Sequence, residues 1–371
     1  MKIEVYSPTI RRKEMDAVLT AMVEDKIGPG EQAKFLIQTA REKIRFDYCL
    51  ALRSPAIALY QALKSLNIER GQGVLVSALS PLYYGRVIED LGLLPLYCDV
   101  LSSTACMGRE SAEKVLASKS EGLDVRCIVL HNTLGYLSDG IGELGFPVIE
   151  DCSQSYGTMT GMDSATGDEG VAVSVSEGIS PENDLSVGMF TLLGLEERDM
   201  LTSGGGALLY SMNRRDAAAL RELGNSGSRD LPPEYGLPDM NAALAVVQFR
   251  EAAKNLSKRR EIASLYTQSA LRTRHKRFIQ SDVKGQSVEY NNYAFPLILE
   301  TGVKDVKAYA KRKDIVVESA FENTLIGSGL VKPEQCPEAY SLSLRTVLFP
   351  IYPRLKMTDA EKVAKLILTL P

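Results

Sequence analysis

The chain has 371 residues, of which 45% are hydrophobic and 24% are charged, and its formal net charge is −4. This length and composition are typical of a soluble globular protein with one large domain or two smaller ones. The weakly acidic balance gives no reason to expect binding to nucleic acid or to an anionic membrane. No apolar run is long enough to span a bilayer, so we expect no membrane segment.

Metal and disulfide chemistry are also disfavoured. The six cysteines form no C-x-x-C pair, and the only histidines are His131 and His275. Zinc and iron sites draw on clustered Cys and His, so we expect no metal. The first residues, Met1 to Val5, lack the apolar run of a secretory signal. We therefore expect reduced thiols and a cytoplasmic protein.

The first half of the chain alternates helical and strand-like segments. Two helices are predicted, from 11 to 23 and, after the break at Gly28-Pro29-Gly30, to about 44. Apolar runs then predict strands at 48–52, 74–78, 94–98, 127–131 and 148–150, separated by helical segments at 56–66, 82–91, 111–118 and 139–144. Further strands are expected at 171–175 and 207–211. This alternation predicts an α/β fold with a mostly parallel sheet and helices on both faces.

The last third changes character. A long helix is predicted from Asp239 to about Leu271. Beyond it, residues 293–299 and 346–351 are strand-like, and residues 304–313 and 358–368 are helical. We expect a large α/β domain at 1–255 and a smaller carboxyl-terminal α+β domain at 256–371.

The most informative stretch follows the strand at 146–149, where the sequence continues Glu150-Asp151-Cys152-Ser153-Gln154. In open α/β sheets, ligands bind just beyond the carboxyl ends of the strands. An acid at position 151 and an amide at position 154 can bind the two polar edges of a flat heterocycle. The same residues also suit a loop in which Asp151 accepts backbone N–H groups. The residues alone leave both interpretations open.

Fragments in a fixed order carry a family resemblance. They are Ser7-Pro8, Ile27-Gly28-Pro29-Gly30, Ala56-Ile57-Ala58-Leu59, Gly92 with Pro95 and Asp99, His131 to Gly135, Ile149 to Gly157, Gly167-Asp168 with Ser174, Gly205-Gly206, Asn241-Ala242-Ala243, and Leu348 to Pro353. Together they span nearly the whole chain and resemble the DegT/DnrJ-type family of pyridoxal-phosphate (PLP) sugar aminotransferases. The resemblance implies fold type I and a homodimer with active sites between subunits. It also implies amino transfer from glutamate to a keto sugar carried on a nucleotide.

The resemblance also implies cofactor contacts. Asp151 would bond the pyridinium nitrogen, and Gln154 would bond the 3-oxygen of the ring. An aromatic side chain of the segment 82–84, such as Tyr83, would stack on the ring. Ser54 and Ala56 fall at the phosphate-binding turn, and Ser174 and Ser176 are further candidate contacts.

The lysine on which the family's reaction depends has no counterpart. That lysine holds PLP covalently and moves a proton between two carbons. No lysine occurs between Lys119 and Lys254. The position falls on Ile179 when counted from Ser174, and on Arg198 when counted back from Gly206. Pairing Phe190-Thr191 with the family's Phe-Ser gives Glu196. None of these side chains can replace lysine.

The expected phosphate contacts are changed as well. Where the family has Ser-Gly-Thr, this chain has Ser54-Pro55-Ala56, which removes one N–H donor and one hydroxyl. Where the family has an asparagine from the partner subunit, this chain has Glu234. These losses, beside the presence of Asp151 and Gln154, indicate that the fold is kept while the transamination chemistry is lost.

The segment 177–203 is longer than the family requires. Its apolar part, 187–195, is expected in an irregular insertion that packs on its own domain, fills the cofactor pocket or contacts a partner chain. Ser203-Gly204-Gly205-Gly206 fits either a phosphate-binding loop or a tight turn before the next strand.

Three interpretations follow. The preferred one is a degenerate homologue that dimerises and binds a small molecule or nucleotide sugar without transamination. The second is an aminotransferase or dehydratase-like enzyme with noncovalent PLP or a lysine from another chain. The third is a non-catalytic subunit that forms a heterodimer with an active paralogue.

Overall fold

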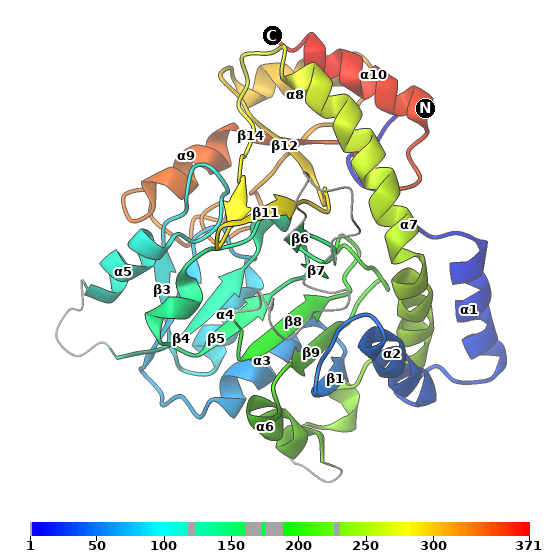
Figure 1. The fold of residues 1–371 in the computed structure, drawn as a ribbon, viewed down its shortest axis with the longest axis vertical. Helices are drawn as coiled ribbons and strands as arrows, with labels where there is room; N and C mark the ends of the chain where they lie inside the picture. Colours follow the sequence, from blue (N-terminus) through cyan, green and yellow to red (C-terminus); the bar gives the residue numbers. More distant parts are fainter. Residues whose placement is uncertain (1, 118–123, 161–172, 175–187, 226–230) are drawn as a thin grey trace.

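The structure is a computed structural model that describes residues 2–117, 124–160, 173–174, 188–225 and 231–371. Its centre is a seven-stranded sheet in the order β1-β9-β8-β5-β4-β2-β3 (Figure 1). The strands are β1 (Tyr48–Leu52), β2 (Gly73–Ser77), β3 (Leu94–Cys98), β4 (Val125–His131), β5 (Val148–Asp151), β8 (Phe190–Gly194) and β9 (Ala207–Ser211).

The sheet is mostly parallel, which confirms the predicted fold class. Strands β3, β2, β4, β5 and β8 pair in parallel, whereas β9 runs antiparallel to both of its neighbours. All residues of β2, β5, β8 and β9 are buried, as expected when both faces are covered. Val74 and Val76 belong to one hydrophobic core, while Leu75 between them belongs to another on the opposite face.

Helices cover both faces of this sheet. They are α3 (Pro55–Ser65), α4 (Tyr83–Asp90), α5 (Arg109–Ala117) and α6 (Arg214–Gly224), with short 3₁₀ turns η1 (Thr133–Gly135), η2 (Ile141–Leu144) and η3 (Pro233–Tyr235). Helices α1 (Arg12–Val23) and α2 (Glu31–Arg41) both pack on the long helix α7 (Asp239–Ala270). In Figure 1, α7 runs along one side of the molecule and α1 lies outside it.

A separate core lies at the carboxyl-terminal end. The antiparallel sheet β12-β14-β13 packs with α8, α10 and the second half of α7. These elements are β12 (Phe295–Ile298), β13 (Glu318–Ser319), β14 (Thr346–Phe349), α8 (Val303–Lys311) and α10 (Met357–Leu368). Helix α9 (Pro337–Arg345) packs instead on the main core, through Ala339 and Leu342. A small third sheet joins β10 (Asp282–Val283), β11 (Gln286–Glu289), β6 (Met159–Thr160) and β7 (Val173–Ser174). The domain limit at 255 falls inside the continuous helix α7 and stays a prediction.

One expectation about the segment 177–203 was wrong. Its apolar part does not belong to an irregular insertion, because Phe190–Gly194 forms β8 between β5 and β9 in the centre of the sheet. A central strand is apolar throughout because both of its faces are buried. The glycines at 204–206 all have positive φ and form the turn that enters β9. Residues 177–187 lie outside the described part of the chain.

The six cysteines are buried and unpaired. Within the described ranges, no helix has the length and apolarity needed to cross a membrane. In the same ranges, no three Cys, His, Asp or Glu side chains gather as metal ligands would.

A buried arginine ties α7 to the carboxyl-terminal core. Arg259 is 4% exposed, and its Nη1 donates hydrogen bonds to the carbonyl oxygens of Tyr293 and Ile351, both at 2.9 Å. Burial lowers the pKa of this guanidinium to about 10, so it remains charged at neutral pH.

We predict that Arg259→Met destabilises the protein by about 3 kcal/mol, because it leaves buried carbonyl groups without donors. Lys258→Met is the matched control, since Lys258 forms a surface ion pair with Glu261, and this substitution should change stability by less than about 0.5 kcal/mol. Urea unfolding measures both. Equal midpoints for Arg259→Met and the native protein would contradict the assigned role.

Candidate functional site

Three neighbouring parallel strands end at one edge of the central sheet. His131 is the last residue of β4, Asp151 the last of β5, and Gly194 the last of β8. The register pairs His131 with Asp151, and Asp151 with Leu192. Asp151 and the residues that follow it therefore lie at the carboxyl ends of the strands, where open α/β sheets bind ligands.

Asp151 is 2% exposed and accepts four hydrogen bonds from its own chain. Its Oδ2 accepts from the hydroxyls of Tyr84 at 2.7 Å and Tyr83 at 3.3 Å. Its Oδ1 accepts from the backbone N–H and the hydroxyl of Ser153. The Ser153 hydroxyl also accepts from the N–H of Gly194 at 2.7 Å, which extends the network to β8. We call Asp151, Tyr83, Tyr84, Ser153 and Gly194 the Asp151 network.

The surroundings of this network keep its donors protonated. Tyr84 is fully buried, and burial, followed by the charge of Asp151, raises the pKa of both tyrosines well above the usual value. Each hydroxyl therefore keeps its proton at neutral pH. His131 lies edge-on to the Tyr84 ring, with centroids 6.1 Å apart, and burial lowers its pKa.

Gln154 is fixed by contacts that the sequence did not reveal. Its Oε1 accepts from the N–H of Leu134 at 2.7 Å, and its carbonyl accepts from the Nδ2 of Asn291. Asn291 is fully buried and also donates to the carbonyl of Tyr156. Gly135 has φ +89°, and a Cβ there would lie 2.5 Å from Asn291 Oδ1, so only glycine fits.

A cavity of about 500 Å³ opens beside this edge. Residues of the central sheet's edge and of the loops around β13 line it, and they include His131, Thr133, Gln154, Arg198, Asp199, Tyr293, Glu318, Glu322 and Asn323. Asp151 does not line this cavity. We refer to this cavity as the cleft.

Two charged residues follow β8 and line the cleft. Arg198 pairs with Glu318 at 2.7 Å and lies over the ring of Tyr6. Asp199 is half-buried, and its Oδ2 accepts from the N–H of Glu196 at 2.8 Å. Burial, followed by the charge of Asp151, raises the pKa of Asp199 to about 7. The Asp199 Oδ2 and the Ser153 Oγ both lie within 2.7 Å of the point that a Cβ at Gly194 would occupy, so Asp199 adjoins the Asp151 network.

The other candidate residues from the sequence lie apart from the cleft. Ser54 accepts from the N–H of Ile57 as the N-cap of α3, and Ala56 packs against the main core. Ser174 is in β7, paired with Met159. Ser176 and Ile179 lie outside the described residues. The structure therefore brings Gln154 and Arg198 into one cavity, with Asp151 and Tyr83 in the network next to it.

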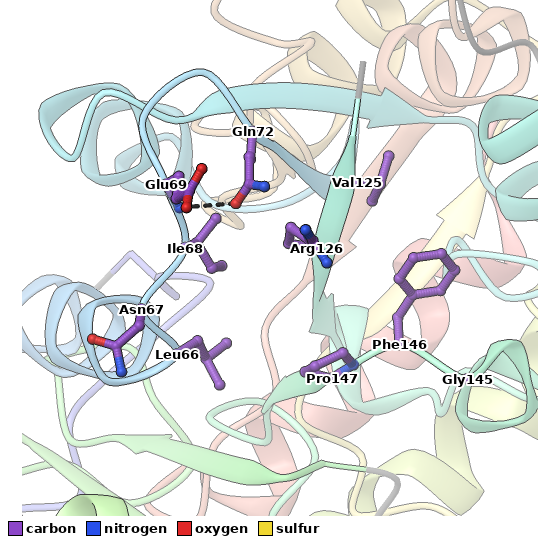
Figure 2. Close-up of a pocket in the computed structure, with 10 residues that line it drawn as sticks. All are labelled: Leu66, Asn67, Ile68, Glu69, Gln72, Val125, Arg126, Gly145, Phe146 and Pro147. Atoms are coloured by element: carbon purple, nitrogen blue, oxygen red, sulfur yellow. Dashed lines mark hydrogen bonds between the residues drawn. The ribbon is translucent and has the colours of Figure 1, made fainter. Parts of the chain in front are cut away.

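A second hollow lies at the opposite edge of the sheet (Figure 2). Val125 opens β4, and Phe146 and Pro147 come just before β5, so this hollow faces the amino ends of the strands. Arg126, which lines this hollow, forms an ion pair with Asp124 at 2.8 Å. Glu69 and Gln72 are joined by a hydrogen bond from the Glu69 N–H to the Gln72 side chain. This hollow has no buried acid or amide comparable with the Asp151 edge, so the cleft is the candidate site.

The raised pKa of Asp199 predicts a pH dependence of stability. A carboxyl with a higher pKa in the folded state than in the unfolded chain binds more protons when folded, so stability falls as pH rises from about 4 to about 7. The loss is at most about 4 kcal/mol for a fully buried group, and the partial exposure of Asp199 lowers it. Asp199→Asn should remove this component and stabilise the protein at pH 8. Thermal unfolding of both proteins from pH 5 to 8 measures it, and parallel profiles would contradict the assignment.

Comparisons with known proteins identify relatives of this chain. The model of the DegT/DnrJ/EryC1/StrS aminotransferase family matches residues 8–177 and 188–368. Between these two ranges, residues 178–187 are not matched, and they include Ile179, one of the three positions inferred for the lysine.

Two of the relatives that the chain matches are named as aminotransferases. L-glutamine:2-deoxy-scyllo-inosose aminotransferase of Streptomyces fradiae is 27% identical over 114 residues, which are 30% of this chain and only 26% of that relative. The dTDP-4-dehydro-2,3,6-trideoxy-D-glucose 4-aminotransferase of Saccharopolyspora spinosa is 22% identical, and the match covers 98% of this chain and 95% of the relative.

Solved structures share the fold. The aminotransferase TlmJ from Streptoalloteichus hindustanus superposes with a TM-score of 0.80 at 17% identity, covering 98% of this chain and 97% of that one. The putative sugar aminotransferase Spr1654 from Streptococcus pneumoniae, in its PLP form, gives 0.79 at 15% identity, covering 100% and 98%. The fold is that of the fold-type-I PLP-dependent aminotransferases. With the family match extending along most of its length, the chain belongs to the DegT/DnrJ/EryC1/StrS aminotransferase family.

Proposed function

We propose that this protein is a non-transaminating member of its family whose cleft binds a small molecule of the nucleotide-sugar class. The observation that carries the proposal is Arg198, four residues after the end of β8. Arg198 stands at one of the positions inferred for the lysine, by counting back from Gly206, and it is paired with Glu318. A guanidinium keeps its proton at physiological pH and is no nucleophile, so Arg198 cannot hold a carbonyl cofactor covalently. The absence of lysine from 120 to 253 supports the same conclusion.

The residues present do not fit PLP in the way that the resemblance implies. The carboxylate assigned to the ring nitrogen already accepts hydrogen bonds from Tyr84, Tyr83 and Ser153. At the turn assigned to the phosphate, Pro55 occupies the start of α3 and has no N–H to donate.

The cleft has the size and donors for a sugar-containing ligand. Its volume of about 500 Å³ is within the usual range for small-molecule sites. The side chains of Gln154, Asn323 and Arg198 line it, and amides and a guanidinium are suitable donors for sugar hydroxyls and for phosphate. One curated relative is named for a dTDP-linked dehydrosugar, which supports this ligand class.

The proposal predicts that no lysine of the purified protein becomes stoichiometrically labelled by PLP and borohydride. Peptide mass spectrometry reads out the label, with an active aminotransferase of the family as positive control. Sparse labelling spread over surface lysines is the expected result, because they lack a site that holds the cofactor. A single lysine labelled to near one equivalent would overturn the proposal.

We further propose that two copies of the chain pair through α1. Met15, Leu19, Met22 and Val23 follow helical spacing along this helix, and each is at least half exposed. Ile27 and Phe35, also exposed, lie close by in sequence. Exposed apolar stripes of this kind are typical of protein interfaces. An active paralogue is the alternative partner for the same surface.

Light scattering after size exclusion tests this pairing. The native protein should show about twice its chain mass of 40.6 kDa, and Leu19→Lys with Met22→Lys should give the monomer mass. Leu271→Lys is the matched control, since Leu271 is 75% exposed but lies far from α1 along the chain. A native protein that is monomeric alone and dimeric only with a co-expressed paralogue would favour the heterodimer. A monomer in both experiments would contradict pairing through α1.

A further inference from the structure

Asp151 is retained in this chain although the lysine is missing, and the structure gives a reason. The carboxylate has about four lone-pair positions, and four donors of the chain point at them. We propose that Tyr84 and Tyr83 occupy the place of a ring-nitrogen donor at Asp151 and so exclude a pyridine cofactor from the end of β5. This inference rests on the proposed function. It extends the exclusion of covalently bound PLP to PLP bound noncovalently.

The tyrosines are held firmly in this position. Tyr84 is fully buried in α4, and its ring packs edge-on against both Tyr83, 5.0 Å away, and His131. Both tyrosines come from the first turn of the helix, where the backbone fixes their direction. Because burial and the charge of Asp151 raise their pKa values, the hydroxyls remain donors over the whole physiological range.

A pyridinium nitrogen needs the oxygen that Tyr84 now holds. To bond the Oδ2 of Asp151, a ring would have to displace the Tyr84 hydroxyl at 2.7 Å or the Tyr83 hydroxyl at 3.3 Å. The displaced hydroxyl would lose its acceptor inside the core, where an unpaired polar group is strongly disfavoured. The Oδ1 atom is no alternative, since the Ser153 backbone N–H and hydroxyl hold it.

The same contacts give Asp151 a structural role. Through Tyr83 and Tyr84 it joins β5 to α4, and through Ser153 and the N–H of Gly194 it joins β5 to β8. Fully satisfied networks of this kind specify one arrangement of a core. The carboxylate of Asp151 thus fixes α4, β5 and β8 relative to one another.

Calorimetric titration with pyridoxamine phosphate tests the exclusion, because this probe carries the ring nitrogen and phosphate but no aldehyde that reacts with surface lysines. The native protein and Asp151→Asn should both show no saturable binding at millimolar probe. Saturable binding to the native protein that Asp151→Asn weakens tenfold or more would overturn the inference. That outcome would leave the absence of a covalent lysine intact, which only the borohydride experiment addresses.

A double-mutant cycle tests the contact itself. Tyr84→Phe keeps the ring and removes the hydroxyl, so it should lower the Tm by at least about 2 °C in the native background. In the Asp151→Asn background the same change should lower it by less than half as much. Equal losses in both backgrounds would contradict the contact. Tyr83→Phe, whose hydrogen bond is longer at 3.3 Å, provides the comparison and should have the smaller effect. The titration decides the proposal if a variant does not fold.

Discussion

The hydrogen bonding of one buried carboxylate holds together the end of the sheet that adjoins the cleft. Asp151 ends β5 at the ligand-binding edge of the sheet, and burial there requires that each of its oxygens be paired. The chain supplies those partners from α4 and from the β5 loop. These contacts give Asp151 a role in packing that does not depend on a cofactor.

Charged side chains that line the cleft form pairs with other residues of the chain. Arg198 is paired with Glu318, and burial, followed by the charge of Asp151, raises the pKa of Asp199 to about 7. Glu322, also in the lining, pairs with Lys307. These side chains satisfy one another, whereas a transaminase needs an amine with a free electron pair at this place. This pairing supports the proposal that the cleft binds a ligand without covalent chemistry.

Much of the fold follows from the sequence alone, because fully buried strands appear as continuous apolar runs and helices separate them. The strand at 48–52 was predicted with the limits that the structure has. The central strand β8 was missed because the residues before it suggested an irregular insertion. The sequence predicted that Asp151 and Gln154 lie at the carboxyl end of a strand, and the structure places them at the end of β5 and in the loop after it. The contact between Asp151 and Tyr84 was not predictable, since the two residues are 67 positions apart and side-chain direction depends on how α4 packs. The contacts of Asn291 were not predictable either, since this residue lies 137 positions from Gln154 and 135 from Tyr156.

The most direct test is a crystal structure of the protein grown with millimolar PLP. The account predicts the Tyr84 hydroxyl within hydrogen-bond distance of Asp151, with no ring density between β5 and the cleft. A PLP ring whose nitrogen bonds Asp151, or whose carbon is joined to any lysine of this chain, would contradict it.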